Sequence, residues 1–171
     1  VEGAMQEIFE SLRWLGLNWD EGPQVGGECG PYVQSERTAL YQEHAQKLID
    51  SGHAYRCFCT ADRLAALRTE QEKNKQPLGY DRKCRDLTQS EVDALLASGT
   101  PHVIRLKIPS GRTVVFNDRI RGPISYESDV LDDIVLIKSD GFPTYHMANV
   151  VDDHYMKITH VMRGDEWIAS T

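Results

Sequence analysis

Apolar residues in the first third of the chain recur at helical spacing. Between positions 4 and 17 this spacing is followed by Met5, Ile8, Phe9, Leu12 and Leu15. They predict a helix with one buried face, which Gly16 ends in a left-handed conformation. A second helix is expected to begin at Ser35, a good N-cap residue, and to stop at Gly52. The segment 18–32 between them is rich in glycine and proline, which predicts an ordered surface loop.

The middle of the chain changes from a helical period to an alternating one. Thr60 is placed to cap one helix, and Thr88 with Glu91 three residues later forms the capping-box pattern of another. Residues 103–108 then alternate as a strand does, Ser110-Gly111 predicts a turn, and 113–116 is expected to return as the second strand of a hairpin. Residues 124–126 are a candidate for a further antiparallel strand.

The last fifty residues predict a strand, a helix, a second strand and a loop. The continuous apolar run 134–137 is typical of a strand buried on both faces. A helix is expected to run through Asn149 and Val150, followed by a strand at 158–162 and a loop at 163–167 that opens another helix. In doubly wound sheets, such loops at the carboxyl ends of strands carry ligands.

The order of these elements predicts an α/β fold with another fold inserted into it, because helices give way to antiparallel strands and then to strand and helix again. The expected divisions are 1–37, a helical part of the first half of the outer domain; 38–122, an α+β insertion; and 123–171, part of its second half. No internal repeat is visible in the sequence.

Charge is distributed unevenly along the chain. The formal net charge is −7, and 40% of the residues are hydrophobic, which excludes a disordered chain. Residues 56–122 nevertheless hold 13 Lys and Arg against 8 Asp and Glu, so the middle is basic and both flanks are acidic. A basic segment suits contact with phosphates, although a mixed, solvated surface explains it equally well. No run approaches the roughly 20 apolar residues that span a bilayer, and we expect a cytoplasmic protein.

Three of the four cysteines lie in one region. Cys57 and Cys59 form a C-x-C pair, and Cys84 follows after 24 residues, so three thiolates are available for a tetrahedral zinc ion. Tyr80 and Asp86 are the candidates for a fourth ligand. The alternative is that reduced cysteines act as small hydrophobic residues of the core. A zinc ion with four protein ligands would be structural.

The tail collects side chains suited to an acidic ligand. Arg163 offers a planar fork for a carboxylate, and Tyr145 and Asn149 offer directed hydrogen bonds. Against this, Arg163 could pair with Asp165, and Trp167 could belong to the core. Asp152, Asp153 and His154 are adjacent, and adjacent residues of a helix diverge by about 100°, which disfavours a metal site there.

Several strings resemble glutamate–tRNA ligases of the bacterial type, and the resemblance runs from one end of the chain to the other. They are 13–23 (RWLGLNWDEGP), 30–37 (GPYVQSER), 101–107 (PHVIRLK), 138–146 (KSDGFPTYH), 148–154 (ANVVDDH) and 163–167 (RGDEW).

The resemblance implies a class I synthetase with a Rossmann-type catalytic fold, interrupted by an insertion that binds the acceptor stem of tRNA(Glu). The family activates glutamate with ATP and Mg²⁺ to glutamyl-adenylate. By this resemblance Tyr145, Asn149 and Arg163 are the glutamate-binding residues, with Arg163 at the side-chain carboxylate. Glu166 and Trp167 are implied contacts to ATP.

The same resemblance makes Cys57, Cys59, Tyr80 and Cys84 the expected zinc ligands, as in some bacterial members. It favours Tyr80 over Asp86, which stands where other members have a histidine. A monomer is expected.

Two family motifs are not in this sequence: the HIGH-type motif expected before Val1 and the KMSKS-type loop expected after Thr171. Because these motifs stabilise charge on the ATP phosphates, the 171 residues alone are expected to be inactive. Alternatives are the short paralogue that glutamylates a base of tRNA(Asp), a glutamine-specific ligase, or a non-catalytic module that binds the acceptor stem.

Overall fold

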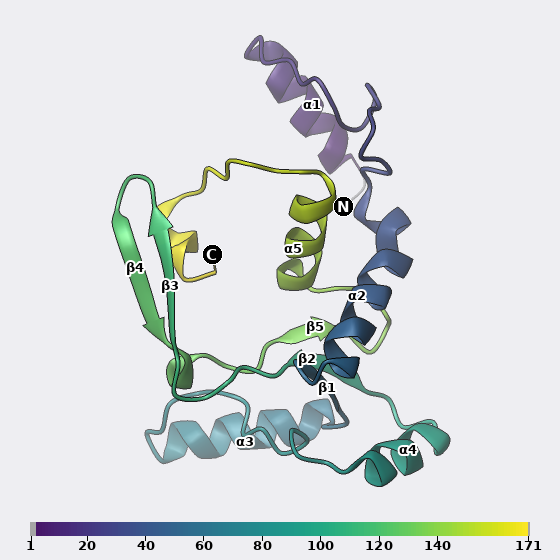
Figure 1. Cartoon of the computed structure of the whole chain (residues 1–171), viewed down its shortest axis with the longest axis vertical. Helices are drawn as coiled ribbons and strands as arrows, with labels where there is room; N and C mark the ends of the chain where they lie inside the picture. Colours follow the sequence, from purple (N-terminus) through teal and green to yellow (C-terminus); the bar gives the residue numbers. More distant parts are fainter. Residues whose placement is uncertain (1–2, 171) are drawn as a thin grey trace.

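The computed structural model describes residues 3–170, which form two small antiparallel sheets with helices around them (Figure 1). The α-helices are α1 (Ala4–Trp14), α2 (Thr38–Asp50), α3 (Ala61–Lys73), α4 (Gln89–Ala97) and α5 (Tyr145–Tyr155). The strands are β1 (Ala54–Cys57), β2 (Val103–Leu106), β3 (Thr113–Asp118), β4 (Gly122–Glu127) and β5 (Val135–Ile137). Three short 3₁₀ helices are η1 (Gln34–Arg37), η2 (Ser128–Val130) and η3 (Asp165–Ser170).

The main hydrophobic core lies where α2 and α5 pack against the three-stranded sheet. Its buried residues are Tyr41, Ala45, Ala54, Leu136, Ile137, Met147, Ala148 and Val151. They come from α2, β1, β5 and α5, so segments on both sides of position 122 share one core. The division at 38 and 122 stays a prediction.

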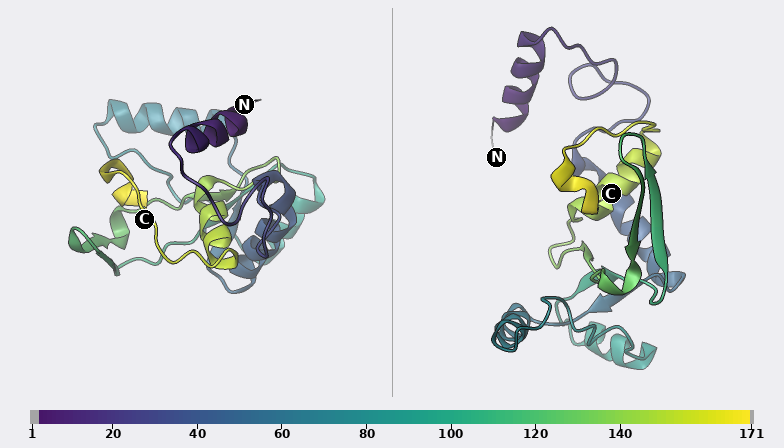
Figure 2. Two further views of the ribbon diagram at one scale, coloured as in Figure 1. Left: turned by 90° about the horizontal axis from the view of Figure 1, so that it is seen from above. Right: turned by 90° about the vertical axis from the view of Figure 1, so that its left-hand side faces the viewer.

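The hairpin predicted from 103–108 and 113–116 is wrong. β2 instead lies in the middle of the sheet β1-β2-β5, antiparallel to both neighbours, with Tyr55 opposite Arg105. β3 pairs with β4, the strand expected around 124–126, and this two-stranded ribbon stands to one side of the sheet (Figures 1 and 2). Alternation identified the strands but not their partners, because pairing depends on contacts distant in sequence.

Helix ends follow local sequence signals closely. The Thr60 hydroxyl accepts a hydrogen bond from the Arg63 amide, and Thr88 and Glu91 form the predicted capping box. Gly16 and Gly52 have φ of +71° and +76°, as expected of glycines after a helix. Ser35 as an N-cap is wrong: it lies inside η1, and α2 begins at Thr38.

The buried face predicted for α1 is largely wrong within the described residues. Phe9 is buried against the Trp19 ring, with the ring centroids 5.2 Å apart, while Met5, Ile8 and Leu15 are more than half exposed. α1 stands apart from the rest of the molecule in Figure 1 and in the right-hand view of Figure 2.

The segment 18–32 is the predicted ordered loop. The Tyr32 hydroxyl and the Cys29 amide both donate to the Glu21 carboxylate. A Cβ atom at Gly27, whose φ is +141°, would collide with the side chains of Glu21 and Tyr32, so this close approach requires glycine.

The predicted strand at 158–162 is also wrong. β5 and α5 are present, and Leu136 and Ile137 are buried as expected, but β5 pairs antiparallel with β2 and the segment 158–162 has no regular structure. Met162 is 95% exposed. Arg163 therefore follows an irregular segment rather than a buried parallel strand. No helix among the described residues is both long and apolar enough to cross a membrane.

Candidate functional site

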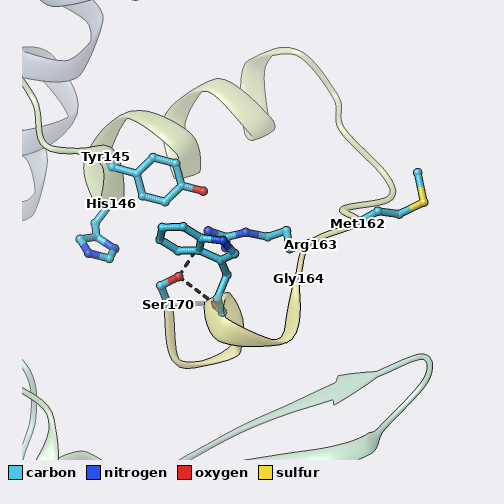
Figure 3. A pocket seen from close by; sticks show the side chains of 7 residues that line it. Tyr145, His146, Met162, Arg163, Gly164 and Ser170 are labelled. Carbon is cyan, nitrogen blue, oxygen red and sulfur yellow. Dashed lines mark hydrogen bonds between the residues drawn. The ribbon is translucent and has the colours of Figure 1, made fainter. Parts of the chain in front are cut away.

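A cleft of about 640 Å³ lies between the start of α5 and the 3₁₀ helix η3. Arg163 lines this cleft, with the guanidinium carbon 5.4 Å from the centroid of the Tyr145 ring and 5.8 Å from that of Trp167. Figure 3 shows Tyr145 and Arg163 reaching into the same space from opposite walls. The full lining is Tyr145, His146, Met162, Arg163, Gly164, Trp167 and Ser170.

Arg163 is held by uncharged groups. Its Nη2 donates to the Ser170 hydroxyl at 3.3 Å, which in turn donates to the Trp167 carbonyl at 2.9 Å. Asp165 is not its partner, because that carboxylate is bound by Arg121. In residues 3–170 no carboxylate pairs with the Arg163 guanidinium, so its charge is available to a ligand.

α5 places Tyr145 and Asn149 on one face, since residues four apart in a helix lie above one another. Asn149 does not line the cleft itself. Its Oδ1 is nevertheless buried, with no hydrogen-bond partner among the described residues. A buried amide oxygen without a hydrogen-bond partner is energetically unfavourable.

The far end of α5 is fixed by a partly buried ion pair. Asp152 accepts from Arg37 Nε at 2.7 Å and from the Tyr41 hydroxyl at 2.8 Å. Arg37 also donates to the carbonyls of Cys29 and Pro31 in the glycine-rich loop. Burial and the hydrogen bond to Asp152 raise the pKa of Tyr41 to about 12. Asp152 is thus a structural anchor rather than a metal ligand.

The residues expected to contact ATP lie at the edge of the cleft. Trp167 is 52% exposed, which excludes a role in the core, and it lies against Arg163. The exposed Glu166 carboxylate lies close to Gly164, where any Cβ would meet it. The sequence pattern did not identify His146, Met162 or Ser170 as lining residues. His146 adjoins Tyr145 at the start of α5, which was the one available signal.

The second cluster is formed by the three cysteines and Tyr80. The sulfur atoms of Cys57, Cys59 and Cys84 all lie within 4.8 Å of one another, with Cys59 and Cys84 3.6 Å apart. The Tyr80 hydroxyl is 3.2 Å from Cys57 Sγ and 3.6 Å from Cys59 Sγ. The Asp86 side chain is 87% exposed and 3.7 Å from Lys107, so it is not part of this cluster.

Burial and hydrogen bonding shift the pKa values in the cluster in different directions. Burial alone would raise the pKa of the Cys57 thiol, but hydrogen bonds with Tyr80, the Cys59 backbone and Arg105 outweigh it and lower that pKa. Burial raises the pKa of the Cys59 thiol to about 11. Burial and hydrogen bonds with the cysteine sulfurs raise the pKa of Tyr80 far above its ordinary value. A divalent cation would displace these protons, because metal ligands bind deprotonated.

A family model described as "tRNA synthetases class I (E and Q), catalytic domain" matches residues 1–171. The chain belongs to this family. A glutamate–tRNA ligase from Treponema denticola is 52% identical over 97% of the chain, and one from Fusobacterium nucleatum is 52% identical over all of it. The chain spans 33% and 34% of those relatives, about a third of their length.

Solved structures agree with this membership. A glutamate–tRNA ligase from Elizabethkingia meningosepticum, crystallised in complex with its amino acid, superimposes with a TM-score of 0.93 at 43% identity. The match covers 99% of this chain and 35% of that one. The predicted fold class and the resemblance to glutamate–tRNA ligases are therefore confirmed. The roles of individual residues stay predictions.

Proposed function

We propose that this chain supplies the amino-acid site of an enzyme that attaches glutamate to tRNA(Glu) through a glutamyl-adenylate. One observation carries the proposal: the Arg163 guanidinium lies in a cleft between two aromatic rings, with no carboxylate bound to it in the described part of the chain. Relatives that match 97% and 100% of the chain bear the name of this activity.

The cleft is suited to select glutamate. The Arg163 fork would bind the side-chain carboxylate through two parallel hydrogen bonds, which glutamine cannot reproduce because its amide nitrogen is a donor. The Tyr145 hydroxyl and the Asn149 amide would bind the remaining polar atoms, and Asn149 Oδ1 lacks a partner in the described chain. A ligand that left these groups unpaired would be rejected.

ATP, with its Mg²⁺, would adjoin this site. We assign Glu166 and Trp167 as its contacts, because both are exposed at the edge of the cleft. A nucleotide bound there could meet the α-carboxylate of glutamate, which is the group that forms the adenylate. The acceptor stem of tRNA(Glu) would be bound by 38–122, the segment that holds the basic part of the sequence. We also propose a cytoplasmic monomer.

We further propose a structural zinc ion bound by Cys57, Cys59, Tyr80 and Cys84. In a tetrahedral site with Zn–S bonds of about 2.3 Å, two sulfurs lie roughly 3.8 Å apart. The 3.6 Å between Cys59 and Cys84 is close to that spacing. Four protein ligands leave no position for a substrate, so the ion would stabilise the fold.

Two other functions fit less well. The paralogue that glutamylates a base of tRNA(Asp) shares the catalytic core, and a non-catalytic acceptor-stem module would need no amino-acid site. The relatives named glutamate–tRNA ligase match the chain from end to end, which favours the first proposal. An open cleft with an unpaired arginine disfavours the module.

The test is glutamate binding to the 171-residue chain, measured by titration calorimetry. We expect wild type to prefer glutamate over glutamine, and Arg163→Lys, which keeps the charge but loses the fork, to lower glutamate affinity about tenfold. Arg119→Lys is the matched control, because Arg119 is exposed and its side chain forms no hydrogen bond or ion pair among the described residues. Equal affinities in the two variants would overturn the proposal. The chain alone should show no ATP–pyrophosphate exchange above background.

A further inference from the structure

Two guanidinium groups adjoin the cysteine cluster. Arg105, on β2, lies over the ring of Tyr80, with its guanidinium carbon 4.0 Å from the ring centroid. Arg63, on α3, directs Nη1 at Cys59 Sγ from 3.4 Å. Both cations are therefore in direct contact with residues of the proposed zinc shell.

Arg105 is a buried cation that lacks a carboxylate. It is 7% exposed, its Nη1 donates to the backbone carbonyl of Asp133 at 2.8 Å, and its Nε is buried without a partner. The nearby Asp133 carboxylate is bound instead by Arg85 and the Tyr55 hydroxyl. No ion pair of Arg105 is present in residues 3–170. A buried charge without a counter-charge is strongly disfavoured.

The proposed metal shell supplies that counter-charge. Three thiolates and a phenolate around a divalent ion leave roughly two negative charges in excess, spread over the sulfur and oxygen ligands. This excess is buried with Cys57, Tyr80 and Cys84, each at most 9% exposed. The positive charge of Arg105 and the excess negative charge of the metal shell would therefore compensate each other.

Arg63 supports the cluster in a different way. Its guanidinium is held by the Asp81 carboxylate, with Nη1 3.2 Å from Oδ1 and Nη2 in a shorter contact with Oδ2. The ion pair with Asp81 fixes the direction of the Arg63 guanidinium, so that one N–H points at Cys59. Groups that orient and hydrogen-bond metal ligands in this way typically contribute tenfold or more to metal affinity.

We propose that Arg105 is the buried counter-ion of the zinc centre and that Arg63, oriented by Asp81, is its hydrogen-bonded support. This inference rests on the zinc site proposed above. Both arginines are positioning residues, because neither binds the metal itself. A consequence is that metal binding and the placement of β2 are linked, since Arg105 lies in the central strand of the sheet.

The experiment is zinc competition with a chromophoric chelator on the whole chain, with circular dichroism to check folding. We expect Arg105→Gln and Arg63→Gln each to weaken zinc binding about tenfold or more. Arg105→Lys should restore most of the affinity, because it returns the positive charge. Arg68→Gln is the matched control: Arg68 lies on the same helix as Arg63, is exposed and forms no hydrogen bond to a sulfur within residues 3–170.

A second readout separates this role from ordinary packing. Zinc should raise the melting temperature of wild type and of Arg68→Gln by the same amount, and that of Arg105→Gln by less. Should Arg105→Gln fail to fold, the zinc affinities of Arg63→Gln and Arg105→Lys still test the inference. The absorption of bound cobalt(II) then reports whether the thiolates remain ligands. Zinc affinities within about twofold of the control in Arg63→Gln and in Arg105→Gln would overturn the inference while zinc itself stood. A wild-type chain that binds no zinc would instead contradict the proposed zinc site, and this inference would then be wrong as well.

Discussion

The cysteine cluster and the Arg163 cleft differ in how far they are assembled before any ligand binds. In the cluster, Cys57, Tyr80 and Cys84 are buried, and their donor atoms already converge at about the spacing a tetrahedral ion needs. In the cleft, Tyr145 and Trp167 are half exposed, and Arg163 follows an irregular connection. One site is closed and the other is open.

The two sites also depend on different parts of the sequence. The cluster is made by residues 57–84, whereas the cleft relies on α5, whose far end is fixed by Arg37 and Tyr41 more than a hundred residues away. A closed site suits an ion that stays, and an open site suits substrates that enter and leave. The two should therefore respond independently to mutation.

The largest effect is expected from Cys57→Ser. Losing one of the four proposed ligands should reduce bound zinc from about one ion per chain to nearly none, because the remaining donors no longer close the shell. Metal analysis after dialysis gives the result. Cys29→Ser is the control, since Cys29 lies outside the cluster, and it should keep its metal. Equal zinc content in both variants would rule out these ligands.

Arg37→Met should be the most damaging change on the cleft side. It leaves Asp152 unpaired in a largely buried position, and breaking such a pair costs about 3–5 kcal/mol of unfolding free energy. Urea unfolding measures the loss, with Arg119→Met as control. The comparison predicts weaker glutamate binding but unchanged zinc content. Loss of zinc in folded protein would show that the two sites are not independent.

Tyr41→Phe should cost less, about 2 kcal/mol, because it removes one hydroxyl that donates to the Asp152 carboxylate. The pKa of Tyr41 is raised from 10.0 to about 12 by burial and that hydrogen bond, so this stabilisation is complete below pH 10. It is lost as the pH rises through 12. The difference in unfolding free energy between wild type and variant should therefore shrink over that interval. A difference in unfolding free energy that stays constant over this pH range would mean that the Tyr41 hydroxyl is not the source of the stabilisation.

The smallest effect is expected from Trp167→Leu. Removing the indole beside Arg163 loses a cation–π contact of about 0.5–1 kcal/mol, which corresponds to a two- to fivefold decrease in glutamate affinity. Trp167→Phe should lose less, because a ring remains to lie against the guanidinium. Equal glutamate affinities of Trp167→Leu and Trp167→Phe in calorimetric titrations would show that the ring does not orient Arg163.

The sequence predicted best what is decided within a few residues. Thr60, Thr88 with Glu91, and Gly16 mark helix ends through hydrogen bonds and backbone geometry that span three or four positions. The gathering of Cys57, Cys59 and Cys84 was also predictable, because an intervening helix returns the chain. In the tail, Tyr145 and Arg163 do meet in one cleft, as expected.

What failed depends on distant partners. β-branched residues favoured a strand at 158–162, but in the described chain no neighbouring strand pairs with it. Alternation could not show that β2 pairs with β1 and β5 rather than with β3. The burial of Arg105 and Asp133 was not predicted either, because nothing in a sequence pattern marks a charged residue as buried.

The most direct test of the amino-acid site is an NMR titration of the isotope-labelled chain with glutamate and, in parallel, with glutamine. We predict that glutamate shifts the resonances of Tyr145, Asn149, Arg163 and the η3 segment, leaves those of the cysteine cluster unchanged, and saturates at lower concentration than glutamine. Equal responses to the two amino acids, or glutamate-induced shifts that spare α5 and Arg163, would contradict a glutamate site in this cleft.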